Sequence, residues 1–399
     1  MNYRTRIVSS LAEVGAARWD GLLAAQALAA GNAEINPFLR YDFLHALHET
    51  GCAHTDTGWQ PQYLTVWEGE EGEEGEEGEE VDKEDEELAA AMPLYVKWHS
   101  YGEYVFDWAW ADAYQRHGLD YYPKLLSSIP FTPVTGARLI AKNTEALAAL
   151  VALLEEVRAS PAVSSAHVLY PPLEQAELLH AAGFMLRSSV QFHWENQDYA
   201  NFDEFLGSLE QKKRKNIRAE RRKVAEAGVS LRRLSGDDIQ PEHWEFFTRC
   251  YDHTYAMHGS EPYLNREFFE RVGKALPEHV LMVVAERAGQ PVASSLVFHT
   301  DTTLYGRYWG ALEEIPCLHF ETAYYQPLEF CIERGLRRFE GGAQGEHKMA
   351  RGFLPQKTWS AHWLAHPGFA DAIEHFLTRE TGGINTYVDE LNERNPFKA

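Results

Sequence analysis

The sequence has few cysteines and no long hydrophobic run. Its four cysteines are Cys52, Cys250, Cys317 and Cys331, and they form neither a CxxC pair nor a metal-ligand spacing. This pattern excludes a disulfide framework and favours a reducing setting. No apolar stretch approaches the roughly 18 residues that span a bilayer, and the first residues lack the hydrophobic region of a secretory signal. We therefore expect a cytoplasmic protein without a transmembrane segment.

Several well-known catalytic motifs are also missing. The chain contains no GxSxG, HExxH or Walker A sequence, and no dinucleotide fingerprint follows a predicted strand. The pairs His45 with His48 and His253 with His258 are expected to be neighbours on helices rather than metal ligands. No metal site is predicted, and hydrolases of the nucleophile-elbow type and P-loop enzymes are excluded.

The negative charge is concentrated in one segment. Of the net charge of −23, residues 68–87 contribute −13 through fourteen acidic residues and one lysine. Such a self-repelling run of Glu and Gly is typical of disorder. Because strand-like sequences flank it, we expect residues 68–87 to form a disordered acidic loop within a β-hairpin. A solvated insertion is favoured over a role in binding calcium or a basic partner.

The length of 399 residues exceeds that of one ordinary core, so two domains are expected. Hydrophobic periodicity, together with Gly and Pro positions, predicts helices and strands in both halves. The expected helices are 16–30, 37–50, 111–127, 144–159, 173–182, 209–227, 243–257, 265–275, 320–334 and 368–381. The expected strands are 62–67, 88–98, 137–141, 165–170, 185–195, 230–234, 280–287, 291–299, 303–309, 337–340 and 359–364.

The same order of elements occurs twice along the chain. Two helices, an antiparallel meander, a helix and a further strand follow one another in each half, which indicates a tandem repeat of one α/β unit. We predict an α/β (α+β) protein with domains 1–198 and 199–399 and mixed, largely antiparallel sheets. The order is that of the GNAT acyltransferase unit, in which the central strands splay apart and the gap admits an acyl donor.

Several phrases along the chain are specific enough to identify a family. They include NPFLRYDFLHALHETG, PLYVKWHSYGEYVFDWAWADAY, GRYWGALEEIPCLHFETAYYQPLEFCIERGL and FEGGAQGEHKMARGFLP. These phrases resemble the FemAB-like predicted N-acyltransferases, and the resemblance covers nearly the whole chain outside the acidic insertion. It implies tandem GNAT-like domains, as in the Fem ligases that attach amino acids from aminoacyl-tRNA to peptidoglycan precursors.

The resemblance also implies the reactants. An acyl donor, either aminoacyl-tRNA or acyl-CoA, acts as a co-substrate and not as a permanently bound cofactor. The acceptor is an amine, on a peptidoglycan precursor or on another molecule, and tRNA is a possible partner.

One departure from ordinary GNAT sequences bears on the donor. CoA-binding GNAT proteins carry an RxxGxG/A loop before the helix that follows the meander, where backbone N–H groups bind pyrophosphate. The corresponding stretch here contains Glu313, Glu314 and Pro316 instead. Carboxylates repel a diphosphate and proline lacks an N–H group, so the sequence favours a donor other than CoA.

The glycine-rich segment 339–356 is the strongest candidate for the site. It combines acid, amide, imidazole, ammonium and guanidinium groups among glycines, which let a backbone approach a ligand closely. Its candidate residues are Gln344, Glu346, His347, Lys348 and Arg351. An ordinary polar surface loop is the alternative.

The start of the predicted helix 320–334 supplies further candidates, His319, Glu321, Tyr324 and Tyr325. Acylation of an amine needs a base and a hydrogen-bond donor for the oxyanion. The base is Glu346, Glu321 or His319, and the donor is Tyr324, Tyr325 or Lys348. The alternative for the tyrosines is packing in the core, and for Glu321 a favourable position at a helix N-terminus.

Three other groups of residues are expected to contact ligands. Strand alternation places Arg307 on the face of Tyr305, and Arg307 is expected to bind substrate with Trp309 unless it forms a surface ion pair. In the first half, an aromatic and acidic patch is expected to line an interdomain cleft and bind acceptor or donor. Its substrate-binding candidates are His99, Tyr101, Asp107 and Trp108.

The third group is the basic helix Lys212–Lys223, with eight positive residues and one negative residue. It is expected to bind phosphates of tRNA, the pyrophosphate of a lipid-linked precursor or an anionic membrane surface. A solvated helix that balances the acidic loop is the alternative. The anion-binding candidates are Lys212, Lys213, Arg214, Lys215 and Arg218.

The sequence thus predicts an N-acyltransferase in which an acceptor amine attacks an activated acyl group directly in an interdomain cleft. Two alternatives stay open. One is a non-catalytic protein that recognises peptide or peptidoglycan, and the other is a CoA-dependent N-acetyltransferase of small molecules.

Overall fold

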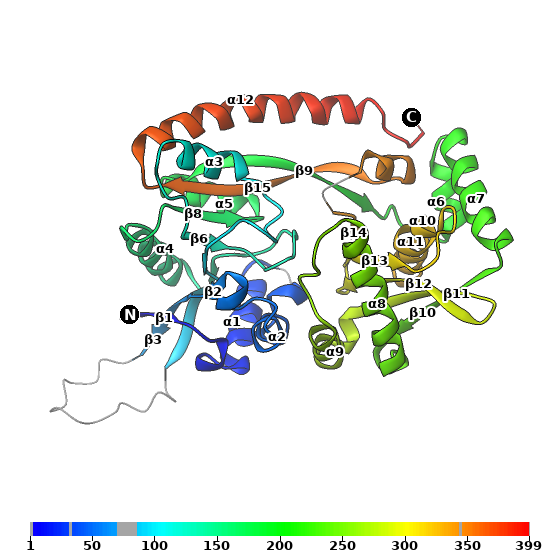
Figure 1. Ribbon diagram of the computed structural model, residues 1–399, viewed down its shortest axis with the longest axis horizontal. Helices are drawn as coiled ribbons and strands as arrows, with labels where there is room; N and C mark the ends of the chain where they lie inside the picture. Colours follow the sequence, from blue (N-terminus) through cyan, green and yellow to red (C-terminus); the bar gives the residue numbers. More distant parts are fainter. Residues whose placement is uncertain (1–2, 32–33, 70–85, 343–344, 399) are drawn as a thin grey trace. The chain divides into compact units, whose positions relative to one another are not determined.

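The computed structural model describes residues 3–31, 34–69, 86–342 and 345–398 (Figure 1). The packing divides the chain into two compact units, each built from two separate stretches. Unit 1 comprises Met1–Ser188 and Thr358–Thr381, and unit 2 comprises Ser189–Lys357 and Gly382–Ala399. The two packing units therefore interleave along the chain. The domain limits 1–198 and 199–399 stay a prediction about the sequence repeat.

Unit 1 contains two groups of paired strands. The first has the order β1-β3-β4-β7 and is antiparallel throughout. The second has the order β15-β8-β6-β5-β2, in which only β6 and β8 are parallel. The strands are β1 (Tyr3–Val8), β2 (Trp59–Pro61), β3 (Tyr63–Glu68), β4 (Glu87–Met92), β5 (Tyr95–Lys97), β6 (Lys124–Ser127), β7 (Ile140–Ala141), β8 (Ser165–Leu169) and β15 (Leu354–Leu364).

The helices of unit 1 bury amphipathic faces against these strands. They are α1 (Ala16–Ala29), α2 (Tyr41–Glu49), α3 (Trp108–Arg116), α4 (Thr144–Arg158), α5 (Leu173–Ala181) and the first part of α12 (Pro367–Asn392). In α4 the buried residues include Ala146, Leu150, Leu153 and Leu154, which share one face at helical spacing. The side chain of Asn143 caps this helix by accepting a hydrogen bond from the Ala146 N–H at 2.8 Å.

Unit 2 contains one sheet with the order β10-β11-β12-β13-β14-β9, in which only β13 and β14 are parallel. Its strands are β9 (Met185–Glu195), β10 (Val229–Ser235), β11 (Val280–Arg287), β12 (Gln290–His299), β13 (Thr303–Ala311) and β14 (Arg338–Glu340). Its helices are α6 (Phe202–Ser208), α7 (Gln211–Glu226), α8 (Pro241–Met257), α9 (Arg266–Ala275), α10 (Leu318–Phe320), the π-helical turn η6 (Glu321–Tyr325), α11 (Gln326–Arg334) and the 3-10 helix η7 (Glu346–Arg351).

Helices cover both faces of the sheet in unit 2. Residues paired across neighbouring strands point to the same face, and β12 pairs with β13 at Ser294 with Gly310 and at Ser295 with Trp309. The face of Gly310 packs against α8, whereas Ser295 donates a hydrogen bond to the Thr322 carbonyl in η6 at 2.7 Å. The helix that begins at α10 therefore lies on the face opposite α8.

The two halves of the sequence exchange their last strands. β9 closes the first half, yet its residues 193–195 pair with β14 in unit 2. β15 is the last strand of the second half, and its residues 360–364 pair with β8 in unit 1. In each unit, a parallel pair of strands is thus followed by an antiparallel strand from the other half of the chain.

The predicted fold class is confirmed, since both units combine helices with mixed, largely antiparallel strands. The predicted hairpin around the acidic loop is also confirmed, because β3 and β4 are antiparallel with Glu68 opposite Glu87. Residues 70–85 of that loop lie outside the described residues. At the ends of the loop the predicted disorder is wrong. Glu86 is buried and forms ion pairs with Arg4 and Arg6 at 3.1 and 2.6 Å.

Three predicted elements need correction. The helix expected over 111–127 ends at Arg116, where Gly118 adopts a left-handed conformation, and Lys124–Ser127 forms β6. The strand expected over 88–98 is two strands separated by Pro93, which lacks a backbone donor. Part of the glycine-rich segment, for which no helix was predicted, forms the short helix η7 over Glu346–Arg351. Among the described helices, none has the length and apolar character needed to cross a membrane.

The contact of α8 with β13 depends on a glycine. A Cβ atom on Gly310 would lie 2.1 Å from the backbone oxygen of Cys250. We expect Gly310→Ala to lower the free energy of unfolding by about 1–3 kcal/mol, because α8 must move away from the sheet. Urea denaturation measures this change. The control is Gly21→Ala in α1, where a Cβ meets nothing within 4 Å. This substitution should leave stability unchanged or raise it by up to about 1 kcal/mol, and an equal loss in both variants would contradict the explanation.

Candidate functional site

The parallel strands β13 and β14 of unit 2 diverge after a short contact. They pair only between Thr303–Tyr305 and Arg338–Glu340, while β13 continues to Ala311. A cavity of about 100 Å³ lies where they separate. Residues of its wall include Gly306, Trp309, His319, Tyr324, Phe339 and Gly341. The predicted gap between central strands is therefore present in this unit.

A β-bulge shapes one wall of the cavity. Leu296 pairs with Tyr308 and Val297 with Gly306, so Arg307 is an extra residue in β13. Bulges redirect side chains and are frequent beside active sites. The bulge interrupts the expected alternation, so the placement of Arg307 on the face of Tyr305 stays a prediction. Arg307 lines the cavity, and its guanidinium lies 5.0 Å from the centre of the Tyr308 ring.

The helix after β13 brings His319 and Tyr324 to the cavity. Their ring centres are 5.4 Å apart, and His319 also lies 5.1 Å from Trp309. Tyr324 belongs to the π-helical turn η6, and such turns are frequently found at functional sites. Within the described residues, the His319 imidazole has ring contacts but no hydrogen bond. Its imidazole nitrogens are therefore available to a ligand.

A larger hollow of about 740 Å³ adjoins this cavity. Trp309 and His319 line both spaces, so they stand between the outer hollow and the inner cavity. The wall of the outer hollow includes Glu313, Glu314 and Pro316, the residues that replace a diphosphate-binding loop. A ligand in either space would therefore lie beside His319 and Trp309.

Burial sets the protonation states at the cavity. Burial, followed by the charge of His347, lowers the pKa of His319 to about 4, so its imidazole is neutral at pH 7. Burial raises the pKa of Tyr324 to about 12, so its hydroxyl keeps its proton. The same effect lowers the pKa of Lys348 to about 8. The cavity thus combines a neutral base with a hydroxyl donor at neutral pH.

The helix η7 lies beside the helix start. The His347 Nε2 atom lies 3.5 Å from the Tyr324 hydroxyl, and Lys348 donates a hydrogen bond to the Gly342 carbonyl at 3.2 Å. The Arg351 guanidinium lies 3.5 Å from the centre of the Phe320 ring. Gln344 lies outside the described residues. His347, Lys348 and Arg351 are thus close to His319 and Tyr324.

Sequence reasoning missed Glu220 on α7. Its carboxylate accepts hydrogen bonds from the Arg351 guanidinium at 2.8 and 2.9 Å and from the Tyr325 hydroxyl. Arg351 also donates to the Tyr325 hydroxyl at 3.0 Å and to the His347 carbonyl at 2.7 Å. One signal could have found Glu220, because it is the single acid in the basic stretch Lys212–Lys223.

Two other candidate bases point elsewhere. Glu321 is 2% exposed and is held by Arg221 at 3.0 and 3.1 Å and by Gln326 at 2.9 Å. Glu346 is bonded to Tyr387 and Arg394, each at 3.0 Å. Both carboxylates are therefore engaged in local bonds, and His319 is the candidate base that lines the cavity.

The predicted anion-binding residues of α7 divide into two groups. Lys212 and Lys215 are exposed and have no ion pair within the described residues. Arg214 donates to the carbonyls of Gly207 and Leu209 at 3.3 and 3.4 Å, and Lys213 is half-buried.

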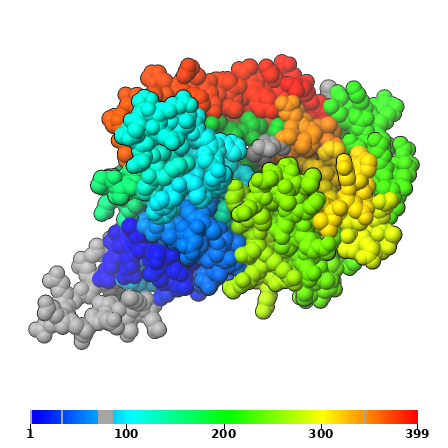
Figure 2. All heavy atoms as spheres, viewed as in Figure 1, coloured from blue at the N-terminus to red at the C-terminus, as the bar shows by residue number. Residues whose placement is uncertain are grey.

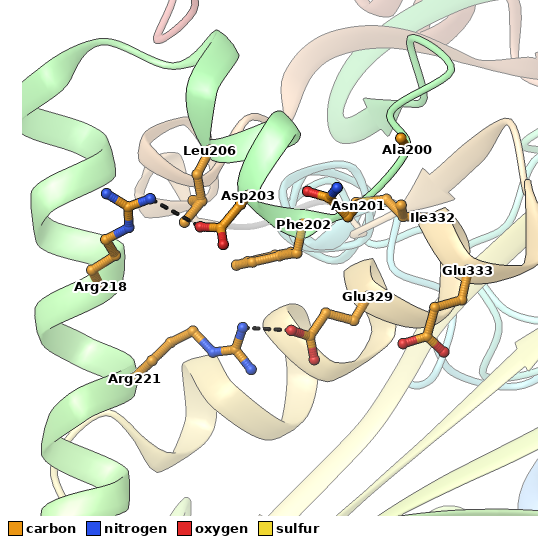
Figure 3. A pocket seen from close by; sticks show the side chains of 10 residues that line it. All are labelled: Ala200, Asn201, Phe202, Asp203, Leu206, Arg218, Arg221, Glu329, Ile332 and Glu333. Atoms are coloured by element: carbon orange, nitrogen blue, oxygen red, sulfur yellow. Dashed lines mark hydrogen bonds and ion pairs between the residues drawn. The ribbon is translucent and has the colours of Figure 1, made fainter.

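Arg218 belongs with Arg221 to a pocket of about 450 Å³ between α6, α7 and α11 (Figure 3). Arg218 pairs with Asp203 at 2.9 Å, and Arg221 pairs with Glu329 at 2.6 Å. Because acids already neutralise both guanidinium groups, this pocket lacks free positive charge for an anion.

The first-half candidates lie in unit 1. Asp107 is buried and pairs with Lys124 at 2.5 Å, whereas the Tyr101 and Trp108 rings are exposed with their centres 4.9 Å apart. His99 Nε2 lies 2.9 Å from the Thr57 carbonyl oxygen. Their placement in an interdomain cleft stays a prediction.

The place beside the parallel strands is filled by side chains in unit 1, whereas in unit 2 it is a cavity. Arg138 is fully buried and donates to the carbonyl of Leu169, the last residue of β8, at 2.9 Å. It also donates to the carbonyls of Val134 and Gly136, each at 2.8 Å. A guanidinium and its own loop thus occupy the end of β8, whereas the place beside the parallel pair of unit 2 is a cavity.

Comparison with known proteins gives a family and a fold. The family model FemAB-like, described as peptidoglycan biosynthesis/recognition, matches residues 10–399. No curated protein sequence matches the chain. The solved structure of FemX is 13% identical, with 94% of this chain and 100% of that chain covered and a TM-score of 0.52.

Two further solved structures are similar to this chain. A conserved protein of unknown function from Bacteroides thetaiotaomicron is 10% identical, with 90% and 99% of the chains covered and a TM-score of 0.50. A tandem GNAT protein from the clavulanic acid biosynthesis pathway is 12% identical, with 92% and 99% covered and a TM-score of 0.44. At these identities the first two show the fold alone.

The lowered pKa of His319 has a measurable consequence. The unfolded chain binds a proton at this residue near pH 6.5, whereas the folded protein does so only near pH 4. Stability supplied by neutral His319 is therefore lost as the pH falls from 6.5 towards 4. Between pH 7 and pH 5, protonation of His319 in the unfolded chain should lower the free energy of unfolding of the wild type by about 2 kcal/mol. We expect the His319→Gln variant to lack this contribution, as measured by urea denaturation at both pH values.

The control is His375→Gln, which removes an exposed histidine of α12. It should keep the wild-type dependence on pH. If the His319→Gln variant lost as much stability on acidification as the wild type, the proposed burial of a neutral imidazole would be wrong.

Proposed function

Because the chain belongs to the FemAB-like family, we propose that it is an N-acyltransferase that acts in the cavity between β13 and β14. The reaction transfers an acyl or aminoacyl group to an amine of a peptidoglycan-type acceptor. One observation carries this proposal: a neutral imidazole and a protonated phenol face the same small cavity at the point where two parallel strands separate.

The chemistry follows from these two groups. The acceptor nitrogen attacks the acyl carbonyl carbon, and a new N–C bond forms. His319 takes the proton that the nitrogen loses, since its pKa of about 4 leaves it unprotonated. Tyr324 donates a hydrogen bond to the oxyanion of the tetrahedral intermediate. The bond from the carbonyl carbon to the donor's oxygen or sulfur then breaks, and the leaving group receives the proton.

The residues around the cavity support and limit this reaction. Lys348 donates a hydrogen bond to the Gly342 carbonyl beside the cavity, and Arg351 holds η7 against Phe320. The cavity volume of about 100 Å³ favours a small acyl group, such as an amino acid with a short side chain. No nucleophilic side chain of the enzyme is required, so transfer is direct.

The outer hollow favours aminoacyl-tRNA over acyl-CoA as donor. Glu313, Glu314 and Pro316 line it, and carboxylates disfavour a diphosphate. The exposed ammonium groups of Lys212 and Lys215 on α7 offer contacts to the phosphates of a long polyanion. These two observations together support a donor whose phosphates bind α7 and not the wall of the hollow.

The first test separates the roles of the candidate residues. We expect Tyr324→Phe and His319→Gln each to reduce transfer by about 10²–10⁴-fold, because each removes a group that acts in the transition state. The control is Glu346→Gln, whose carboxylate is bonded to Tyr387 and Arg394 and should be dispensable for chemistry. Mass spectrometry of a muropeptide acceptor incubated with aminoacyl-tRNA or acyl-CoA measures the product.

The binding of donor and acceptor is measured in parallel by thermal shift, since a ligand of the native state raises the melting temperature. Retained binding with lost transfer in Tyr324→Phe supports catalysis. Ligand binding without product in the wild type would favour the non-catalytic recognition protein, and acyl-CoA as the only productive donor would contradict the proposed donor.

The second test concerns α7. The double variant Lys212→Glu with Lys215→Glu should weaken binding of aminoacyl-tRNA at least about tenfold and lower the dependence of affinity on salt. The matched control reverses two exposed cations elsewhere in unit 2, Arg249→Glu with Lys274→Glu, and changes the net charge equally. Filter binding at several salt concentrations measures both variants. Equal weakening in the two would mean that net charge, and not α7, governs the interaction.

A further inference from the structure

Five aromatic side chains are exposed on one short segment of unit 1. The segment, residues 98–108, joins β5 to α3 and is called the aromatic loop here. The exposed side chains are Trp98 (45%), Tyr101 (57%), Tyr104 (37%), Phe106 (59%) and Trp108 (40%). The cyan part of the chain that includes this loop lies at the surface in Figure 2. Large aromatic groups exposed together mark interaction sites.

The loop is wound around one buried ammonium group. The Lys124 Nζ atom, which is fully buried, donates to Ser100 and Glu103 at 2.8 Å and to Asp107 at 2.5 Å. Three residues spread along the loop therefore converge on a single atom. The polar side chains point inward and the aromatic side chains point outward, which is the reverse of an ordinary surface loop.

The outward side of the loop carries no exposed formal charge. Its two carboxylates, Glu103 and Asp107, are buried against Lys124. Its one histidine, His99, has a pKa lowered by burial and by Lys97, so it is neutral at pH 7. The surface offered to a partner consists of aromatic rings with polar edges.

Four backbone carbonyl groups of the loop accept hydrogen bonds from inside unit 1. The oxygens of Tyr101, Gly102, Tyr104 and Phe106 each accept a hydrogen bond from the protein. Their donors are Lys97 Nζ (3.4 Å), Phe131 N–H (3.2 Å), Tyr170 O–H (2.9 Å) and Arg187 Nη1 (2.8 Å). Such carbonyls can leave water without losing a bonding partner, which is a requirement for entering a lipid environment.

We propose that the aromatic loop docks unit 1 onto the surface of a lipid bilayer with zwitterionic headgroups. Trp and Tyr rings prefer the boundary between headgroups and acyl chains, because they combine an apolar body with a polar edge. The net charge of −23 disfavours an anionic surface, and the uncharged loop needs none. A glycan would require outward polar groups to fix its hydroxyls, whereas the carboxylates of this loop point inward. The proposal stands independently of the acyltransferase reaction.

Co-sedimentation of the full chain with phosphatidylcholine vesicles tests this proposal. The wild type should bind, and raising the salt concentration should not release it, because the contact is apolar. The double variant Trp98→Ser with Phe106→Ser should reduce the bound fraction at least about tenfold. The matched control, Leu28→Ser with Leu173→Ser, removes two other exposed apolar side chains of unit 1 and should bind like the wild type. Circular dichroism and melting temperature establish that all variants are folded.

Three outcomes would overturn the proposal. The first is no binding of the wild type to phosphatidylcholine vesicles. The second is binding only to vesicles with phosphatidylglycerol and release by salt, which would assign the contact to basic residues. The third is equal loss of binding in both double variants. Binding of purified peptidoglycan glycan strands that Trp98→Ser with Phe106→Ser abolishes, without vesicle binding by the wild type, would identify a sugar site instead.

Discussion

The ion pair between Arg351 and Glu220 joins three parts of unit 2. Arg351 belongs to η7 and Glu220 to α7, and both bond to the Tyr325 hydroxyl in the π-helical turn. The side chain of Arg351 is only 6% exposed, so removing its partner would leave a charge without compensation. Because Arg351 also holds the His347 carbonyl, the position of η7 beside the cavity depends on this pair.

The two units share one arrangement of strands but differ in what lies beside the parallel pair. Both contain a parallel pair, β6 with β8 and β13 with β14. In unit 1 the Leu169 carbonyl at the end of β8 and the Val134 carbonyl in the loop before β7 accept hydrogen bonds from Arg138, and these polar contacts fill the space. In unit 2, β13 has a bulge, and two glycines without side chains, Gly306 and Gly341, line the cavity. This difference explains why, among the described residues, a cavity lies beside the parallel pair of unit 2 whereas buried side chains fill the corresponding place in unit 1.

Hydrophobic periodicity and helix-ending glycines predicted those helices and strands whose bounds depend on nearby residues. β9 and β11 have the expected bounds, and β11 begins with the apolar and β-branched run VLMVV. The helix after β13 ends at Arg334, as expected, and Gly335 follows it in the left-handed conformation. A run of four residues is too short to show a period, so the sequence places Lys124–Ser127 in the preceding helix. In the structure these residues form a strand because they pair with β5 and β8.

The candidate site divides in the same way. The phrases of the chain pointed to His319 and Tyr324, and the geometry places both at the cavity. The partners Glu220 and Arg221 come from a helix about a hundred residues earlier, and nothing in their local sequence shows which acid or base they meet. The bulge at Arg307 is equally invisible, because it depends on the register with β12. Residues whose roles arise from long-range pairing are thus the ones that sequence patterns could not assign.

The exchange of β9 and β15 also governs how the chain can be made. The strand β15, which pairs with β8, is complete only when residue 364 has been synthesised. By then the other strands of unit 1 have long left the ribosome. Until then, β8 presents unpaired backbone groups that invite contact with other chains. The nascent chain depends on the last strand, β15, to cover β8, which is made much earlier. Chains that stall or end before β15 would therefore leave β8 open to pairing with other chains.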